Sequence, residues 1–288
     1  MSEKSALVSR ILNFSCVDGP GNRLVIFLQG CNFDCLNCHN PHTINHCNHC
    51  GDCVDSCPTQ ALAMTDNKVV WDEGLCTHCD KCIDICGHKS SPKIKRYNVT
   101  QTLELIRSQH FFISGITVSG GEATLQLPFI IALFSAIKAD RELGHLTCFI
   151  DSNGYLPIHA WEKVAPVLDG VMLDLKSWQS ETHQWLTRRD NHRVIGSIRY
   201  LASAKKLHEL RLLHIPGKSD LDGEIDEVVK LIRSLPADVV VRLNAFQHHG
   251  VSGQALEWEK CSEDEMNRFR SLIADKIVQP ILTPAIYT

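Results

Sequence analysis

Three cysteines in CxxxCxxC spacing, Cys31, Cys35 and Cys38, form the most distinctive group in this sequence. They follow the apolar run 24–28, which has the length and composition of a buried strand, so we expect them in the loop at its carboxyl end. Three thiolates cannot supply all four ligands of a [4Fe-4S] cluster, and one iron would stay open to a ligand from outside the chain. The alternative is half of a zinc site, for which no fourth ligand is obvious.

Eight further cysteines form two blocks that share the spacing CxxCxxCxxxC. The blocks begin at Cys47 and Cys76 and are followed by Pro58 and Gly87. This is the spacing of bacterial ferredoxins, in which the fourth cysteine of each block ligates the other block's cluster. Zinc ribbons, the alternative, use well separated CxxC pairs. We therefore expect two more [4Fe-4S] clusters, one on Cys47, Cys50, Cys53 and Cys86 and the other on Cys57, Cys76, Cys79 and Cys82.

Composition limits the class of protein. The chain has 288 residues, 44% of them hydrophobic and 22% charged, and a formal net charge of −4, which gives no electrostatic footprint for nucleic acid or an anionic membrane. No apolar run approaches the ~20 residues of a membrane-spanning helix. Fourteen cysteines in a chain of this size indicate metal or cluster ligands rather than disulfides. We expect a cytoplasmic protein, with Cys16, Cys148 and Cys261 as free thiols.

Beyond residue 98 the pattern alternates helices with strands. Strands are expected at 24–28, 113–118, 146–150, 170–175, 210–215 and 239–243. Helices are expected at 99–110, 127–143, 158–167, in a stretch up to 206, at 225–235 and at 264–273. Strands joined by helices predict a parallel sheet with right-handed crossovers. The chain outside the cysteine-rich segment is too short for an eight-stranded barrel.

Polar motifs follow one predicted strand after another. They are Ser119-Gly120-Gly121-Glu122, Asp151-Ser152-Asn153-Gly154, the pair Asp174 and Lys176, the strand residue Arg211, and the loop 244–249. Parallel barrels keep their active sites at the carboxyl ends of the strands, so we expect these motifs to share one site. Each also has a simpler interpretation: the glycines as a plain turn, the charged pair as a solvated one, and the arginine as a solvent-facing residue.

The cysteine loop also carries a family resemblance. CxxxCxxC after a first barrel strand, preceded by Asp18-Gly19-Pro20-Gly21 and continued by Cys38-His39-Asn40-Pro41, resembles the radical S-adenosylmethionine (SAM) enzymes, in particular the activating enzymes of glycyl radical enzymes. The resemblance extends from about Val8 to His249. It implies a partial (β/α)6 TIM-like barrel, formed by 1–41 and 96–288. The segment 42–95 would be an inserted ferredoxin-like two-cluster domain, as in the YjjW-type branch.

The resemblance also assigns roles to residues. Cys31, Cys35 and Cys38 would hold the catalytic cluster. The SAM contacts would be Ser119, Gly120, Gly121, Glu122, Asp151, Ser152, Asn153, Asp174, Lys176, Arg211 and Gln247. Two positions depart from the family pattern: Asn37 stands where an aromatic residue is usual, and Gln247 aligns with a histidine of the pyruvate formate-lyase activase. His248 or His249 are the alternatives for that histidine.

The implied activity is reductive cleavage of SAM to methionine and a 5′-deoxyadenosyl radical, which abstracts an α-hydrogen from a glycine of a partner glycyl radical enzyme. The resemblance implies three [4Fe-4S] clusters, a monovalent cation near the SAM carboxylate, and flavodoxin or ferredoxin as electron donor. It also implies a monomer. Two other interpretations are left open: a radical SAM enzyme acting on a peptide or small molecule, and an iron–sulfur electron carrier that never cleaves SAM.

Overall fold

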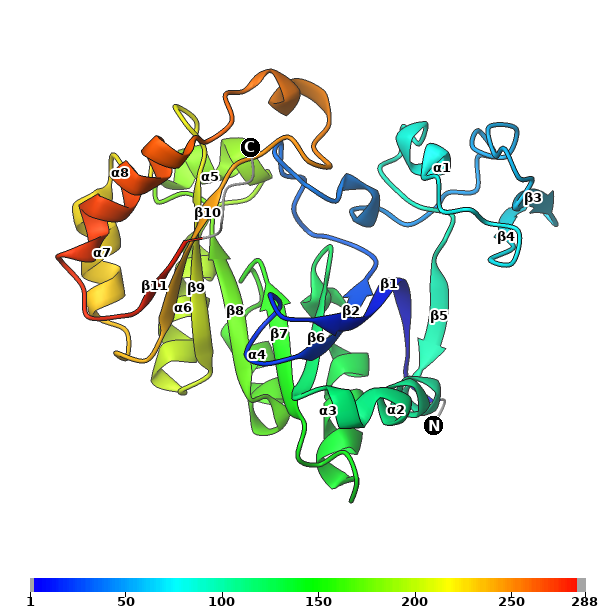
Figure 1. Cartoon of the computed structure of the whole chain (residues 1–288), viewed down its shortest axis with the longest axis horizontal. Coiled ribbons are helices and arrows are strands. Elements are labelled where there is room, and N and C mark those ends of the chain that lie inside the picture. The colour runs from blue at the N-terminus through cyan, green and yellow to red at the C-terminus, as the bar shows by residue number, and fades with distance from the viewer. Residues whose placement is uncertain (1–2, 284–288) are drawn as a thin grey trace.

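A mixed sheet of nine strands forms the centre of the computed structural model, which describes residues 3–283 (Figure 1). Six neighbouring strands are parallel, as the sequence predicted. They are β2 (Arg23–Leu28), β6 (Gly115–Gly120), β7 (Thr147–Ser152), β8 (Gly170–Leu175), β9 (Leu207–His214) and β10 (Val240–Ala245). The sheet is open, with β11 at one edge and β5 at the other. The predicted outer limits of the core, residues 1 and 288, lie outside the described residues.

Three strands extend the sheet beyond this parallel set. The long strand β1 (Ser5–Ser15) pairs with β2 in the antiparallel direction, and β5 (Lys95–Asn98) pairs with the start of β1. The short strand β11 (Ile281–Leu282) adds to β10 in parallel. β5 directly follows the cysteine-rich segment and returns the chain to the main sheet.

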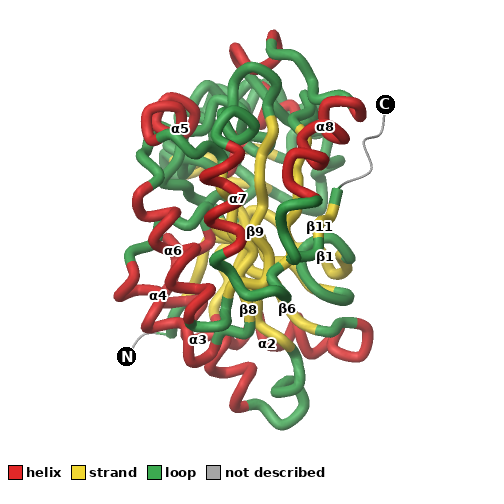
Figure 2. The backbone as a smooth tube through the Cα atoms, turned by 90° about the vertical axis from the view of Figure 1, so that its left-hand side faces the viewer, coloured by secondary structure: helices red, strands yellow, loops and turns green. Residues whose placement is uncertain are grey.

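Helices cover the outer face of the curved sheet (Figures 1 and 2). They are α2 (Val99–Gln109), α3 (Leu127–Ala139), α4 (Ile158–Val164), α5 (Ser180–Thr187), α6 (His192–Ser203), α7 (Ile225–Arg233) and α8 (Glu263–Ala274). α3 ends four residues before the predicted limit, because the Asp140 carboxylate accepts hydrogen bonds from the next backbone N–H groups and forms a turn. The predicted long helix before residue 206 is divided into α5 and α6 at Arg188, whose φ of 68° is left-handed.

The cysteine-rich segment forms a separate small lobe beside the sheet, at the upper right of Figure 1. It contains a hairpin of β3 (Leu62–Thr65) and β4 (Lys68–Trp71) and the single-turn helix α1 (Lys81–Asp84); the 3-10 turn η1 (Pro41–Thr43) precedes it beside the cysteine loop. Its buried apolar cluster consists of Cys53, Leu62 and Val69. So small an apolar core needs cross-links or bound metal for stability.

A buried arginine joins the amino-terminal ends of three strands. Arg23, at the start of β2, is 0% exposed. Its guanidinium donates to Thr117 Oγ1 (2.7 Å), Thr147 Oγ1 (2.9 Å) and the Pro20 carbonyl (3.1 Å), and it lies 4.5 Å from the centre of the Phe149 ring. Burial lowers the pKa of Arg23 to about 10, so the side chain stays charged at neutral pH. The guanidinium therefore closes the floor of the barrel with satisfied polar groups.

Among residues 3–283, no helix combines the length and the apolar character that crossing a bilayer requires.

Replacing Arg23 with methionine should lower the free energy of unfolding by about 3 kcal/mol, because the hydroxyl and carbonyl acceptors would stay buried without donors. Arg96→Met is the matched control, since Arg96 is exposed on β5 and makes one hydrogen bond, to Ser5 Oγ. Its expected change is within about 0.5 kcal/mol. Anaerobic urea titrations followed by circular dichroism measure both. Equal effects of the two substitutions would show that the buried network contributes no special stability.

Candidate functional site

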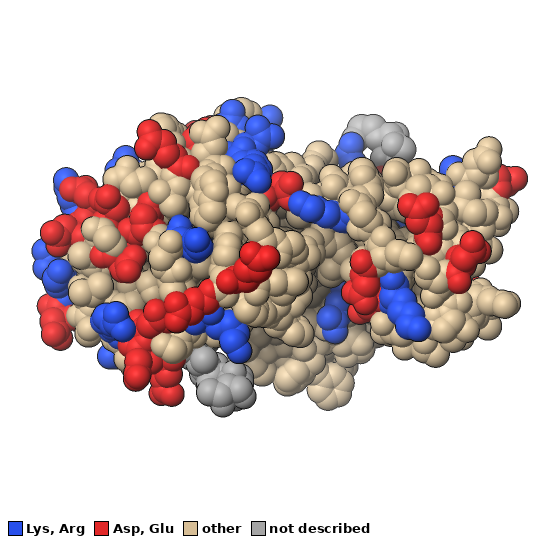
Figure 3. Space-filling view, turned by 90° about the horizontal axis from the view of Figure 1, so that it is seen from above, with Lys and Arg blue, Asp and Glu red and all other residues tan. Residues whose placement is uncertain are grey.

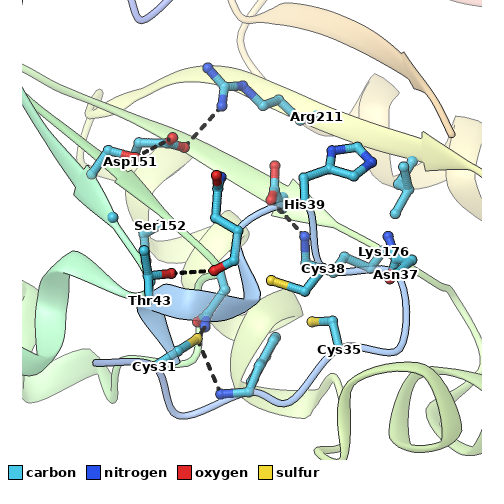
Figure 4. A pocket seen from close by; sticks show the side chains of 18 of the residues that line it. Cys31, Cys35, Asn37, Cys38, His39, Thr43, Asp151, Ser152, Lys176 and Arg211 are labelled. Carbon is cyan, nitrogen blue, oxygen red and sulfur yellow. Dashed lines mark hydrogen bonds and ion pairs between the residues drawn. The ribbon is translucent and has the colours of Figure 1, made fainter. Parts of the chain in front are cut away.

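A cavity of about 510 Å³ opens at the carboxyl ends of the parallel strands. Twelve of the fourteen residues predicted for the catalytic cluster and SAM line it. They are Cys31, Cys35, Cys38, Ser119, Gly120, Gly121, Asp151, Ser152, Asn153, Asp174, Lys176 and Arg211. The motif residues from separate strands therefore meet at one cavity (Figure 4).

The cysteine loop is held at both ends. Gly30 N donates to Thr43 O and Cys31 N to Ile44 O, each at 2.9 Å, so the loop returns to its own starting point. The Gln29 side chain donates to two carbonyls of the returning segment. The far side of the loop is attached to the end of α5, where Leu36 N donates to Leu186 O at 2.9 Å. These bonds fix the loop that carries the three thiols.

The three thiols face the same cavity (Figure 4). Burial raises the pKa of Cys35 to about 12, and it also raises the pKa of Cys31 and of Cys38. Free thiols in this setting are protonated at neutral pH, whereas iron binding deprotonates them. Within residues 3–283, no three His, Cys, Asp or Glu side chains converge closely enough to hold one metal ion.

The two glycines after β6 allow a close approach of backbones. Gly120 has φ of +130°, and a Cβ there would meet Leu28 O at 2.1 Å. A Cβ on Gly121 would meet Gly30 O at 2.4 Å and Thr43 O at 2.6 Å. Because any side chain would separate these segments, the glycines position the end of β6 against the cysteine loop. They also expose backbone to the cavity.

Glu122 lies behind the cavity wall and is absent from its lining. Its carboxylate accepts hydrogen bonds from Thr124 N (3.0 Å), Thr124 Oγ1 (2.6 Å), Ser152 Oγ (2.9 Å) and Asn153 N (2.7 Å). Burial raises the pKa of Glu122, and these hydrogen bonds oppose that effect. The carboxylate ties the loop after β7 to the end of β6, and Asn153 in turn donates to Asn32 Oδ1 at 2.8 Å. Its contact with the SAM ammonium group stays a prediction.

A charged network lies on the opposite wall. Arg211 on β9 donates to Asp151 Oδ1 at 3.0 Å and to Glu209 Oε1 at 2.6 Å, while Ser119 Oγ donates to Asp151 Oδ2 at 2.9 Å. Burial alone would lower the pKa of Arg211, but the facing carboxylates raise it above its ordinary value. The guanidinium is thus a fixed cation inside the cavity. Figure 4 shows it reaching across to Asp151.

Asp174 and Lys176, at the end of β8, form an ion pair with Nζ 2.8 Å from Oδ2. Their side chains are 27% and 17% exposed, so this is not the fully solvated pair that the simpler interpretation predicted. Burial would lower the pKa of Lys176, but Asp174 and then the Cys35 thiol raise it. A cation therefore lies beside the cysteine loop.

Gln247, the predicted SAM contact in the loop after β10, points away from the cavity. Gln247 Nε2 donates to Cys261 O at 2.9 Å, and the side chain does not line the cavity. Of the alternatives, His248 contacts Trp258 O at 2.7 Å and His249 is exposed. In their place, Asn244 lines the cavity.

The lining also includes polar residues to which the sequence assigned no role, among them Asp18, Asn37, His39, Asn40 and Asn244. Each stands in a motif or loop that the sequence singled out, but no chemistry distinguished the individual position. Asn37 is 6% exposed, and its Oδ1 has no hydrogen-bond partner among the described residues. A buried acceptor of this kind is available to a bound molecule.

The small lobe brings its cysteines together in the predicted sets. One small cavity is lined by Cys47, Cys50, Cys53 and Cys86, and another by Cys57, Cys76, Cys79 and Cys82. Each set thus contains three cysteines of one block and the fourth of the other, the arrangement of two-cluster ferredoxins. The donors fit [4Fe-4S] clusters, although the assignment of clusters to them stays a prediction. Outside these sets, Cys148 and Cys261 are buried and Cys16 is exposed.

The chain is similar to known proteins both in sequence and in fold. Residues 25–232 match the family model described as the radical SAM superfamily. The pyruvate formate-lyase-activating enzyme of Streptococcus mutans is 30% identical over 237 residues, covering 80% of this chain and 73% of that protein. The pyruvate formate-lyase 1-activating enzyme of Escherichia coli strain K12 is 31% identical over 239 residues, covering 80% and 77%. Streptococcus suis SuiB bound to precursor peptide SuiA aligns with a TM-score of 0.57 at 13% identity, covering 91% of this chain and 48% of that one, which shows the fold.

Glu122→Gln should lower the free energy of unfolding by about 1–3 kcal/mol, because the amide nitrogen must face the N–H of either Thr124 or Asn153. Glu265→Gln, in the exposed capping box of α8, is the control and should change it by at most about 0.5 kcal/mol. Urea titration and calorimetric SAM binding are measured together. Weaker SAM binding with unchanged stability would instead indicate a direct contact of Glu122 with the ammonium group.

Proposed function

Since the chain belongs to the radical SAM superfamily, we propose that it activates a glycyl radical enzyme by generating a radical on one glycine of that partner. The chain is an enzyme that uses radical SAM chemistry, and its curated relatives are activating enzymes of glycyl radical enzymes. One observation carries the proposal for this chain. Three thiols and the motif residues from five strand ends line a single cavity large enough for a ligand.

Cys31, Cys35 and Cys38 fit a [4Fe-4S] cluster with one open iron, since they share a cavity and no fourth cysteine lines it. These cysteines would hold a cluster that, when bound, would supply the electron for reductive cleavage of SAM to methionine and a 5′-deoxyadenosyl radical, which would take hydrogen from the glycine α-carbon of the partner. The chain itself needs no general acid or base. Its residues orient the reactants and keep water away.

The remaining lining residues suit the polar parts of SAM. The exposed backbone of Gly120 and Gly121 can approach a ligand closely, and Arg211 offers a fork of donors that suits a carboxylate. Asn37, at the position where the family resemblance implies an aromatic ring, offers a buried acceptor that a bound molecule could satisfy. Lys176 is a fixed cation beside the cysteine loop, and the resemblance also suggests a monovalent cation near the SAM carboxylate.

The two four-cysteine cavities support three clusters in all, in a ferredoxin-like insert of the YjjW-type branch. We place the insert at 42–95, with flavodoxin or ferredoxin as the electron donor. We also propose that the protein is cytoplasmic and monomeric.

The partner's glycine segment has a route into the cavity. A cleft of about 710 Å³ lies between the insert and the edge strands β1 and β5. It shares Phe27, Asn40, Thr43 and Gly120 with the lining of the thiol cavity, so the two spaces adjoin. Figure 3 shows this face from above, with the barrel on the left, the insert on the right and a hollow between them. An extended polypeptide could pass from the cleft to the thiols.

The cleft walls suit a peptide. Trp71 and Tyr97 supply aromatic surface, and Arg10 is exposed and forms no ion pair among the described residues. Lys95 and Tyr97 line the cleft from β5, whereas Arg96 between them does not, as the alternation of a strand requires. The outer edge of β5 has no strand partner among residues 3–283, and such edges accept extended peptides by strand addition.

The anaerobically reconstituted and reduced protein should convert SAM to 5′-deoxyadenosine, whereas Cys35→Ala should give only background product, because its cluster would lose one of three protein ligands. Chromatography of the product and iron analysis of both proteins measure this. Each glycyl radical enzyme of the source organism is then added, and the glycyl radical is sought by electron paramagnetic resonance (EPR).

A glycyl radical with one partner supports the proposal. Product without a radical on any partner would indicate a radical SAM enzyme acting on another substrate. No product even with the partners present, in protein that holds its full iron, would indicate an electron carrier.

Tyr97→Ala combined with Arg10→Glu should weaken binding of a short synthetic peptide centred on the partner's glycine about tenfold, because aromatic surface and a cation are both removed. Arg96→Glu is the matched control on the same strand and should leave the affinity unchanged. Fluorescence anisotropy of the labelled peptide measures both. Unaltered affinity in the double variant would exclude the cleft as the route, while SAM cleavage without partner would still support the activity.

A further inference from the structure

Trp71, at the end of β4, carries a buried polar group that nothing satisfies. Its indole Nε1 is inaccessible to water and has no hydrogen-bond partner among residues 3–283. A buried N–H without an acceptor costs about 1–3 kcal/mol, and nearly all such groups in proteins find a partner. The small lobe has little apolar core with which to offset this cost. The unsatisfied donor therefore points to an acceptor that binds beside it.

The ring lies at the wall between two spaces. One face borders the cavity of Cys57, Cys76, Cys79 and Cys82, and the indole packs in the same apolar cluster as two of these cysteines. The ring also borders the large cleft, where the Lys95 amine lies 5.3 Å from its centre. Because water can enter the cleft but does not reach Nε1, the N–H is buried within the lobe and is not exposed to the cleft.

The two four-cysteine cavities share one backbone hydrogen bond to sulfur and differ in other residues of their lining. In each, the backbone N–H two residues after the first cysteine donates to that cysteine's sulfur at 3.4 Å, from His49 to Cys47 and from His78 to Cys76. Of the two four-cysteine cavities, Trp71 lines the one that contains Cys57, Cys76, Cys79 and Cys82, whereas β4 presents Val69 to the other.

The charged residues that line the two four-cysteine cavities also differ. Lys81 and Lys93 line the cavity that Trp71 borders, together with Asp80, whereas Asp52 is the charged residue in the lining of the other. The Ser91 hydroxyl also lines that other cavity; its oxygen accepts from Lys93 N at 3.1 Å, and its O–H is a weaker, neutral donor on that side.

We propose that the indole N–H of Trp71 donates a hydrogen bond to a sulfur of the cluster held by Cys57, Cys76, Cys79 and Cys82, and thereby makes it the higher-potential cluster of the insert. This rests on the proposed function, since it requires a cluster there. Hydrogen bonds to sulfur and nearby cations stabilise the reduced cluster, which carries one more negative charge. Trp71 is a positioning and tuning residue and takes no part in SAM cleavage.

The test is an EPR-monitored redox titration of the full-length protein. A Cys79→Ala variant identifies the signal of this cluster by its loss. Trp71→Phe should lower the midpoint potential of that signal, so that the oxidised-to-reduced ratio at the wild-type midpoint rises at least about threefold, or about 30 mV for one electron. Trp71→His, which retains a ring N–H, should restore much of the shift. Trp185→Phe, on the surface of α5, should shift nothing.

Iron and sulfide analysis distinguishes a failure of the cluster assignment from a failure of the Trp71 hydrogen bond. A wild-type protein without iron at these cysteines counts against the cluster assignment of the proposed function. An unchanged potential in an iron-loaded Trp71→Phe protein overturns the present inference alone. Should Trp71→Phe lose the cluster, proton electron–nuclear double resonance of the wild type with ¹⁵N-indole decides. An exchangeable proton coupled to both nitrogen and cluster supports the bond, and its absence overturns it.

Discussion

The close approach of two backbones, the cysteine loop and the end of β6, is the constraint on which the site depends. Thr43 O and Gly30 O leave no room for a Cβ on Gly121, and Glu122 N donates to Gly30 O at 2.7 Å. Glu122 then joins this contact to the loop after β7 through its buried carboxylate. The thiols, the glycine backbone and the loop after β7 are thus held as one unit, and the cavity is preorganised before any ligand binds.

Ion pairs fix the charged side chains around this unit. Arg211 is held by carboxylates from two strands, and Lys176 by Asp174 on its own strand. Each cation therefore keeps its place without a ligand, at the cost of burying its partner with it. A negatively charged group entering the cavity meets fixed donors rather than mobile side chains, which limits the ordering cost of binding. Arg23 performs a comparable role at the opposite end of the strands, where it has no access to a ligand.

The insert has little apolar core, unlike the sheet, and is organised around its cysteines. Its apolar cluster is small, and its hairpin and single-turn helix bring two mixed sets of four cysteines together. The cleft between this lobe and the barrel reaches the thiol cavity. A partner segment and the accessory clusters would thus share one boundary, at Trp71, so that docking and electron supply meet in the same region of the molecule.

The sequence by itself predicted the six parallel strands and the residues that meet at their carboxyl ends, because strand period, crossover chirality and cysteine spacing are local properties. It could not predict the direction of individual side chains. Glu122 and Gln247 stand in the right motifs yet point away from the cavity, because Thr124, Ser152 and Asn153 surround one and Cys261 O accepts from the other. The break between α5 and α6, the edge strands β1 and β5, and the cleft beside them arise from contacts between distant segments. Only the tertiary structure decides these features, since no local pattern encodes which groups will surround a side chain.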